Sequence, residues 1–177
     1  MNIFRHAFIA IAIGSLFSSP VHANDDTGVN AIYGRLVDAA RNNDATKFDT
    51  IYELDSVYMG ANIPPIIGKD DIRSAFISSW TKARGDGAMV DLQFRLVQRI
   101  WHSDSAVTDI GYSKFSFIYD DKSKEPRVSY SKFVTLAQRK KDGTWVWRID
   151  IDNTQSPKTG AAEFEALRPV GQLRYDE

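Results

Sequence analysis

Hydrophobic residues recur with a helical period in the first half of the chain. Between residues 29 and 40 they lie three or four positions apart, at Val29, Ile32, Tyr33, Leu36, Val37 and Ala40. This spacing predicts a helix with one apolar face. Shorter patterns of the same kind predict two more helices, over residues 45–52 and 70–84. A β-prone segment at 56–59 and a loop at 60–68 separate them, because Pro64-Pro65 cannot continue a central strand.

From residue 91 onward the period changes from helical to alternating. Four segments either alternate or are rich in β-branched and aromatic residues, over residues 91–102, 106–119, 128–139 and 144–152. Such segments are typical of strands, and the polar residues between them, such as Lys140–Gly143, are typical of hairpin turns. Three helices followed by four strands predict an α+β fold with the helices on one face of the sheet.

The first 23 residues differ from the rest of the chain. Arg5 and His6 give a short positive region, and residues 7–17 form an apolar run too short to span a bilayer. Val21 and Ala23 supply the small-x-small pattern of a signal-peptidase site, and the sequence turns polar at once after Ala23. We therefore expect a cleaved signal peptide, a periplasmic or secreted protein and no membrane association after cleavage. The alternative is an uncleaved membrane anchor.

Composition excludes several classes of function. The 177-residue chain is 43% hydrophobic, which as a prior predicts one domain with a sizeable core. Its formal net charge of −1 gives no basic excess for binding nucleic acid. It has no cysteine, which excludes thiol nucleophiles, zinc–thiolate sites and redox motifs. No cofactor is predicted, and no glycine-rich loop of the phosphate-binding type is present.

Three short motifs occur in a characteristic order. They are the strand start at Asp55–Tyr58, the turn from Pro64 through Gly68 to Ile72, and the D-G-x-W-x-x-x-x-D sequence of Asp142–Asp150. Together with the order of the elements, they resemble the NTF2-like superfamily and, within it, the SnoaL-like or DUF4440-like branch. The resemblance implies three N-terminal helices packed on a strongly curved mixed or antiparallel sheet, which wraps as a cone around a pocket. It also implies a homodimer formed through the outer sheet face.

The N-terminal pattern and the resemblance together divide the chain into three expected parts. Residues 1–23 are the signal peptide, 24–153 the NTF2-like domain and 154–177 a C-terminal extension. Ketosteroid isomerases of this superfamily use a carboxylate base after the first strand and a tyrosine-plus-acid oxyanion hole. In this chain the tyrosine's position is Leu36 and the base's position is Gly60. Both departures remove that chemistry, so isomerase activity is not carried over.

Strand carboxylates are the candidate acid or base groups. Asp109, Asp150 and Asp152 would have raised pKa values if they faced an apolar pocket. The competing interpretation is that they lie on a solvated face, paired with basic residues of the same strands, namely Arg95, Arg99, Lys132 and Arg148. This interpretation is favoured, because basic residues are numerous on these strands and solvated faces are common in antiparallel sheets. Alternation places Trp145, Trp147, Ile149 and Ile151 on one face of the last strand and Arg148, Asp150 and Asp152 on the other. Asp150 is the best catalytic candidate, since it closes the family-like motif, and Asp109 is the second.

Five residues are predicted to contact a ligand, namely Tyr58, Trp80, Tyr112, Tyr130 and Asp150. For Tyr58 the alternative is a core aromatic whose hydroxyl reaches the surface. Trp101 shares a face with Arg95 and Arg99 by alternation, which makes it the best candidate for an interface. His102 is the last histidine of the chain and is expected in an exposed turn, so no metal site is predicted.

Three functional hypotheses follow. The first is a domain that binds a small, partly apolar molecule in its cone, with catalysis left open. The second is an acid/base enzyme of the isomerase, dehydratase or hydrolase type that uses Asp150 or Asp109. The third is a dimeric module that acts through the outer face of its sheet. Alternation alone does not choose among them, because the long strands carry mixed residues on both faces.

Overall fold

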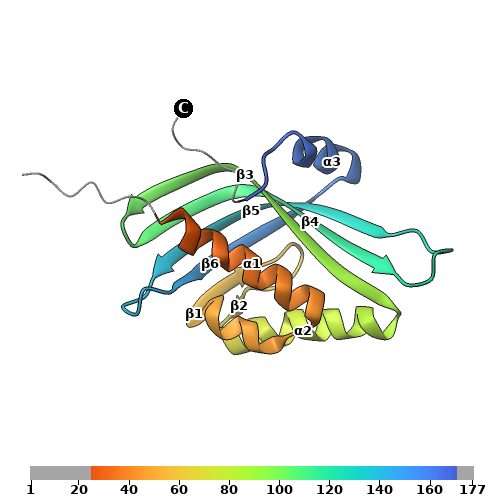
Figure 1. Ribbon diagram of the computed structural model, residues 1–177, viewed down its shortest axis with the longest axis horizontal. Helices are drawn as coiled ribbons and strands as arrows, with labels where there is room; N and C mark the ends of the chain where they lie inside the picture. The colour runs from red at the N-terminus through yellow and green to blue at the C-terminus, as the bar shows by residue number, and fades with distance from the viewer. Residues whose placement is uncertain (1–24, 171–177) are drawn as a thin grey trace, which may run out of the picture.

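The computed structural model describes residues 25–170, which leaves the predicted signal peptide outside the described residues (Figure 1). The helices are α1 (Asp26–Asn42), the 3-10 helix η1 (Ala45–Thr50), α2 (Lys69–Gly85) and α3 (Pro157–Glu165). The Asp25 side chain caps α1 by accepting the Gly28 N–H, and Asn43 ends it in the left-handed conformation with φ of 53°. None of the helices within residues 25–170 is both long and apolar enough to cross a membrane.

Six strands form one mixed sheet. They are β1 (Tyr52–Met59), β2 (Ile66–Ile67), β3 (Ala88–Ser103), β4 (Ala106–Tyr119), β5 (Arg127–Arg139) and β6 (Trp145–Gln155). Their order across the sheet is β2-β1-β6-β5-β4-β3. β1 runs parallel to β6, and every other neighbouring pair is antiparallel. The predicted α+β fold with a mixed sheet is confirmed. Two local expectations are wrong: Tyr52 starts β1 instead of ending a helix, and the predicted loop at 60–68 contains β2.

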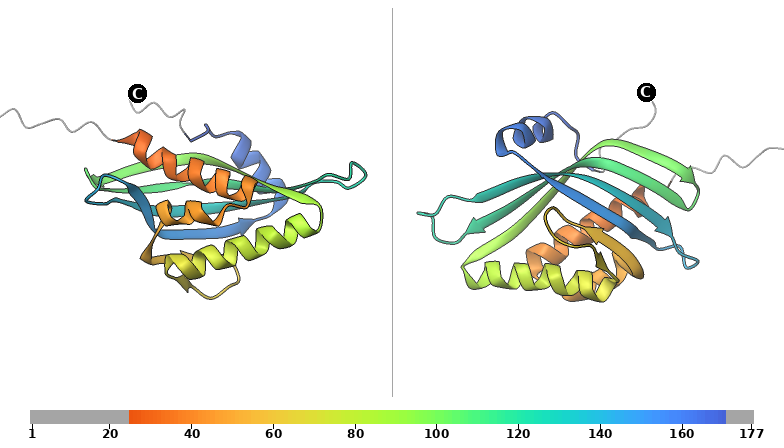
Figure 2. Two further views of the ribbon diagram at one scale, coloured as in Figure 1. Left: turned by 60° about the horizontal axis from the view of Figure 1, so that its bottom comes forward. Right: turned by 180° about the vertical axis from the view of Figure 1, so that it is seen from behind.

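The first three helices and α3 lie on opposite faces of the sheet. Helices α1, η1 and α2 cover the concave face, and the main core lies beneath them (Figures 1 and 2). That core includes Phe48, Trp80 and Trp147, all almost fully buried. Helix α3 packs on the convex face over β4 and β5, where Phe164 is buried against Tyr130 with ring centroids 5.8 Å apart. The C-terminal segment thus adds a second, smaller core.

Two β-bulges decide which side chains face the helices. In β3, Leu96 pairs with Gly111 and Gln98 pairs with Ile110, so Val97 is an extra residue. In β6, Trp147 pairs with Ala137 and Ile149 pairs with Leu136, so Arg148 is an extra residue. A bulge shifts the alternation of a strand by one position. Strict alternation is therefore wrong beyond both points.

The bulge in β6 turns the carboxylates inward. Trp145 and Trp147 face the core as expected, but beyond Arg148 the concave positions are Asp150 and Asp152. Ile149 and Ile151 then face outward and are 38% and 37% exposed. The Arg148 side chain remains outside, where it pairs with Asp55 of β1. The sequence pattern predicts the opposite arrangement, with Ile149 and Ile151 inward and Asp150 and Asp152 outward.

Candidate functional site

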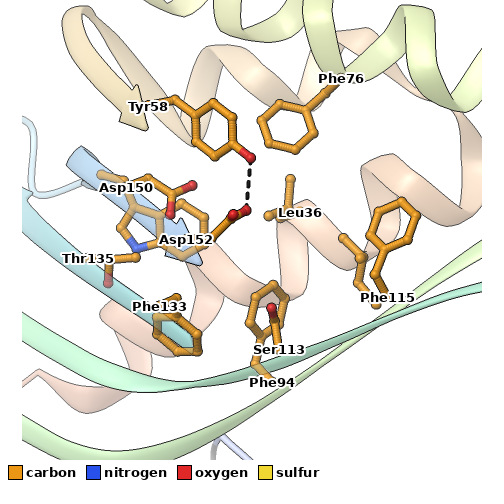
Figure 3. A pocket seen from close by; sticks show the side chains of 12 residues that line it. Leu36, Tyr58, Phe76, Phe94, Ser113, Phe115, Phe133, Thr135, Asp150 and Asp152 are labelled. Atoms are coloured by element: carbon orange, nitrogen blue, oxygen red, sulfur yellow. Dashed lines mark hydrogen bonds between the residues drawn. The ribbon is translucent and has the colours of Figure 1, made fainter. Parts of the chain in front are cut away.

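A small chamber opens between the concave face of the sheet and helices α1 and α2 (Figure 3). Its volume is about 60 Å³. Apolar side chains from five elements form most of its wall: Leu36, Phe76, Leu92, Phe94, Phe115 and Phe133. The indole of Trp147 completes that wall. The polar residues are Tyr58, Ser113, Thr135, Asp150 and Asp152. The chamber is thus apolar with a few polar groups, as ligand sites usually are.

Asp150 is the most perturbed carboxyl group of the site. It is almost fully buried, and Tyr52 donates a hydrogen bond of 2.6 Å to its Oδ2 atom. Burial raises the pKa of Asp150 to about 7, although the hydrogen bond from Tyr52 opposes the rise and the charge of Asp152 adds to it. A carboxyl group with this pKa can both donate and accept a proton near neutral pH.

Asp152 lies two residues further along the same strand and closer to the mouth. Tyr58 donates a hydrogen bond of 2.8 Å to Asp152 Oδ2, shown as the dashed line in Figure 3. The Ala61 N–H donates to the other carboxylate oxygen at 3.3 Å. Burial, followed by the charge of Asp152, raises the pKa of Tyr58, so its phenol stays protonated and acts as a donor. Each carboxylate of β6 is therefore held by one tyrosine hydroxyl from β1.

A polar row crosses the concave face, since Arg99, Asp109, Thr135 and Asp150 are successive register partners from β3 to β6. At its far end Asp109 accepts two hydrogen bonds of 2.7 Å from Arg99 and one of 2.8 Å from Tyr33. The Arg99 and Asp109 side chains are 0% and 1% exposed. Asp109 does not line the chamber, and these three contacts occupy both of its oxygens. It forms a buried ion pair with Arg99, so the carboxyl groups that line the chamber are those of Asp150 and Asp152.

Two of the wider hollows share Tyr58, Phe115 and Asp152 with the chamber. One of about 400 Å³ is mainly apolar and is lined on the α2 side by Ala75, Phe76 and Trp80. The other, of about 260 Å³, is lined by hydroxyl groups of the open sheet end: Ser113, Ser129, Ser131 and Thr154. Tyr58, Phe115 and Asp152 line the chamber and both hollows. They therefore stand at the boundary between the outer space and Asp150.

The structure brings together only part of the predicted ligand set. Tyr58 and Asp150 line the chamber, and Trp80 forms part of the wall of the apolar hollow. Tyr112 and Tyr130, in contrast, lie on the convex face under Phe164 of α3. Their place in the ligand set is corrected, because both alternate with inward residues on strands without a bulge at that point: Tyr112 precedes Ser113, and Tyr130 precedes Ser131.

Trp101 and His102 do not line the chamber. Trp101 packs edge-on against Trp145 with centroids 5.6 Å apart, next to the main core. The bulge at Val97 places Trp101 on the concave side with Arg99, so the expectation that it shares a face with Arg95, which packs over Phe164 of α3, is wrong. His102 is exposed and hydrogen-bonds Thr108 at 2.8 Å. Within residues 25–170, no group of three or more potential metal ligands is clustered.

Sequence reasoning missed Tyr52 and Thr135 as members of the site. The sequence pattern predicts Tyr52 at the end of a helix, and no motif marks Thr135. Both become visible only from the strand pairing in the structure, in which Thr135 pairs with Asp150 and Tyr52 pairs with Trp147. Leu36 lies in the chamber wall, and Gly60 lines the hydroxyl-rich hollow, where a Cβ atom would lie 2.7 Å from the Tyr58 hydroxyl. In this protein the carboxylates of the site are Asp150 and Asp152 of β6, and the position after β1 is Gly60.

Solved structures share this architecture. A ketosteroid isomerase-like protein from Erwinia carotovora atroseptica aligns with a TM-score of 0.59 and 16% identity, over 76% of this chain and all of that one. ActVI-ORFA from Streptomyces coelicolor aligns at 0.63 and 17%, over 73% and 96%. A protein with a cystatin-like fold from Caulobacter vibrioides aligns at 0.60 and 13%, over 77% and 94%. No protein-family model matches the sequence, and a search of curated proteins finds no match. The predicted NTF2-like fold is confirmed.

Proposed function

We propose that the cone binds a small, partly apolar molecule whose polar end reaches Asp150. The observation that carries this proposal is the chamber itself: a wall of aromatic rings with two carboxylates at one end, each held by a tyrosine hydroxyl. Aromatic walls with a few fixed polar groups are the usual composition of small-molecule sites. The neighbours' shared fold agrees with this proposal, since this fold includes a protein described as ketosteroid isomerase-like.

The sizes of the spaces suggest how a ligand is placed. The chamber of about 60 Å³ holds only a few heavy atoms, whereas the apolar hollow outside it has about 400 Å³. The body of the ligand therefore occupies the hollow beside Phe76 and Trp80. Its polar end passes Tyr58 and Asp152 into the chamber.

A neutral fluorescent probe, N-phenyl-1-naphthylamine, tests the proposal. Ala75 is exposed on α2 and lines the apolar hollow, so Ala75→Trp fills that space with little effect on folding. Ser78→Trp adds the same indole to an exposed position of α2 that lines neither the chamber nor the two hollows. We expect Ala75→Trp to weaken probe binding at least about tenfold, which corresponds to about 1.4 kcal/mol, and Ser78→Trp to leave it within about twofold. Equal binding by both variants and the parent would refute the proposal.

Acid/base catalysis by Asp150 is a second candidate function. The buried carboxyl group with a pKa of about 7 favours it, since that value suits proton transfer at neutral pH. Exchange of the C–H protons next to the carbonyl of 2-tetralone in deuterated water provides a test by NMR. We expect the protein to accelerate this exchange and Asp150→Asn to abolish the acceleration, while Asp109→Asn, if folded, retains it. Exchange at the buffer rate with the parent protein would exclude this activity for the probe.

A homodimer through the convex face is the third candidate. Met59, Ile151 and Val134 are neighbours across β1, β6 and β5, and they are 43%, 37% and 40% exposed. Contiguous exposed apolar residues often mark a protein interface. Helix α3 covers the β4 side of this face and leaves the β1 side open. We expect light scattering to give a dimer that Ile151→Lys converts to a monomer. A monomeric parent protein at high concentration would contradict the proposal.

A further inference from the structure

The carboxylate of Asp152 has no positively charged partner among residues 25–170. It accepts hydrogen bonds from the Tyr58 hydroxyl at 2.8 Å and from the Ala61 N–H at 3.3 Å, and no Lys, Arg or His of the described residues forms an ion pair with it. An ionised carboxylate has about four acceptor positions, so these two hydrogen bonds leave room for a further donor. Asp152 is half-buried and lines the chamber, where a ligand can reach it.

Asp109, on the same face of the sheet, differs because it is paired within the protein. Arg99 donates two hydrogen bonds of 2.7 Å to it, and both side chains are almost fully buried. The open end of the cone has no such cation, since no Lys, Arg or His lines the chamber or the two hollows that share Asp152. Lys114 of β4 and Lys132 of β5 lie over tyrosine rings of the convex face instead. The charged groups of the open end are therefore acidic only.

Three half-buried aromatic rings border the same space as Asp152 (Figure 3). Tyr58, Phe76 and Phe115 line both the chamber and the apolar hollow, as Asp152 does. The rings of Tyr58 and Phe76 are tilted against each other, with centroids 5.0 Å apart. The face of an aromatic ring carries partial negative charge and attracts a cation. A carboxylate beside several rings is thus a suitable environment for an ammonium group on an apolar body.

We propose that the open end of the cone binds an organic cation, with its ammonium group held by Asp152 and its apolar body in the hollow beside Phe76. This inference rests on the proposed binding function and names the class of ligand. The ammonium group then points toward Asp150, whose ionised form a nearby cation favours.

Other charged ligands fit this space less well. An anion would be repelled by Asp152, and by Asp150 when that group is ionised. A divalent metal ion requires more ligands, since no three potential ligands are clustered within residues 25–170. A primary or substituted ammonium group on an apolar ring satisfies both the carboxylate and the aromatic walls.

Two probes that share one skeleton and differ in charge test the inference. 2-Phenylethylamine is protonated at neutral pH and 2-phenylethanol is neutral, and both can be measured by displacement of N-phenyl-1-naphthylamine. We expect the amine to bind at least about tenfold more tightly, which corresponds to about 1.4 kcal/mol. We expect its affinity to fall between about 0.01 M and about 1 M salt, because salt screens charge attraction, while that of the alcohol stays within about twofold.

The variant Asp152→Asn removes the charge and keeps an oxygen that can accept the hydrogen bond from Tyr58. We expect it to reduce the preference for the amine to within about threefold. Asp120→Asn makes the same charge change at an exposed position that lines neither the chamber nor the two hollows, and it should keep the full preference. If Asp152→Asn does not fold, the two probes and their salt dependence in the parent protein decide the question.

Failure of this inference can be distinguished from failure of the proposed function. If the amine binds no more tightly than the alcohol, or keeps its preference in folded Asp152→Asn, while Ala75→Trp weakens binding of N-phenyl-1-naphthylamine, the cone binds ligands but Asp152 does not select a cation. If neither probe binds and Ala75→Trp leaves N-phenyl-1-naphthylamine binding unchanged, the proposed binding function fails as well.

Discussion

Asp150 and Asp152 show how two identical side chains on one strand acquire different properties. Asp150 lies in the aromatic chamber, where burial penalises its charged form and outweighs the hydrogen bond from Tyr52. Asp152 lies at the mouth and accepts hydrogen bonds from Tyr58 and the Ala61 N–H. Asp150 therefore has a raised pKa, whereas Asp152 holds the hydroxyl of Tyr58 in place.

The raised pKa of Asp150 predicts a specific pH dependence of stability. The folded protein holds this proton up to about pH 7, whereas the unfolded chain releases it near 3.8. The folded state binds more protons between these values, so the contribution of Asp150 is fully present below pH 3.8 and is lost as the pH rises through 7. By pH 8 the loss is on the order of 2–4 kcal/mol.

Asp150→Asn removes this titration and checks the prediction. Urea unfolding from pH 5 to pH 8 should show the variant gaining stability relative to the parent as the pH rises. Asp152→Asn serves as the matched control on the same strand. Parallel curves for Asp150→Asn and the parent would show that Asp150 titrates normally.

At the scale of elements, the sequence predicted the helices and long strands but not the faces of two strands. The change from a helical to an alternating period is spread over many residues, which makes it a strong signal. The bulges at Val97 and Arg148 each depend on one residue, and neither residue type marks a bulge. The apolar series Trp145, Trp147, Ile149 and Ile151 continued smoothly in the sequence, so nothing in it showed that the inward series changes after Trp147.

The same point explains which site residues were predictable. Asp150 was identified by its motif and Tyr58 by its place in the first strand, while their contacts required the register. Tyr112 and Tyr130 were assigned to the wrong face. For Tyr112 alternation alone shows a conflict, since the other candidate Asp109 is three residues away on a regular part of β4 and therefore faces the opposite side.

Deletion of Arg148 tests the role of the bulge. Trp147 and Ile149 pair with the adjacent residues Ala137 and Leu136. Without Arg148, regular alternation therefore keeps Asp150 and Asp152 inward and Ile149 and Ile151 outward. We expect the deletion to fold and to lose less than about 2 kcal/mol of unfolding free energy, because it removes the bulge and the Arg148–Asp55 ion pair but exchanges no inward residue. The measurement is urea unfolding followed by tryptophan fluorescence.

Deletion of Lys122 is the control for the Arg148 deletion. This residue lies in the exposed hairpin loop between β4 and β5, so its removal should cost less than about 1 kcal/mol. If the Arg148 deletion prevented folding while the Lys122 deletion did not, Arg148 would not be an extra residue whose removal restores regular alternation.

At the scale of the whole molecule, the two faces of the sheet carry different features. The concave face carries the core, the buried Arg99–Asp109 pair and the chamber. The convex face carries α3 on one side and exposed apolar residues on the other. The proposed ligand binding and the proposed self-association involve separate faces, so we expect Ile151→Lys to leave binding in the cone unchanged.

Export stays a prediction from the first 23 residues of the sequence. Asn24 should be the first residue of the mature protein recovered from the periplasm or medium of an expressing bacterium, as N-terminal sequencing would show. Recovery of the protein with its Met1 end intact in the membrane fraction would instead support an uncleaved anchor.

The most direct test of the central claim is the location of a bound ligand. Isotope-filtered NOE spectra of labelled protein with unlabelled 2-tetralone report which protons lie within about 5 Å of it. We predict contacts from the ligand to the rings of Tyr58, Phe76 and Phe115, which line both the chamber and the apolar hollow. Contacts to Val134, Ile149 and Ile151 of the convex face, with none to these rings, would contradict the claim that the cone is the binding site.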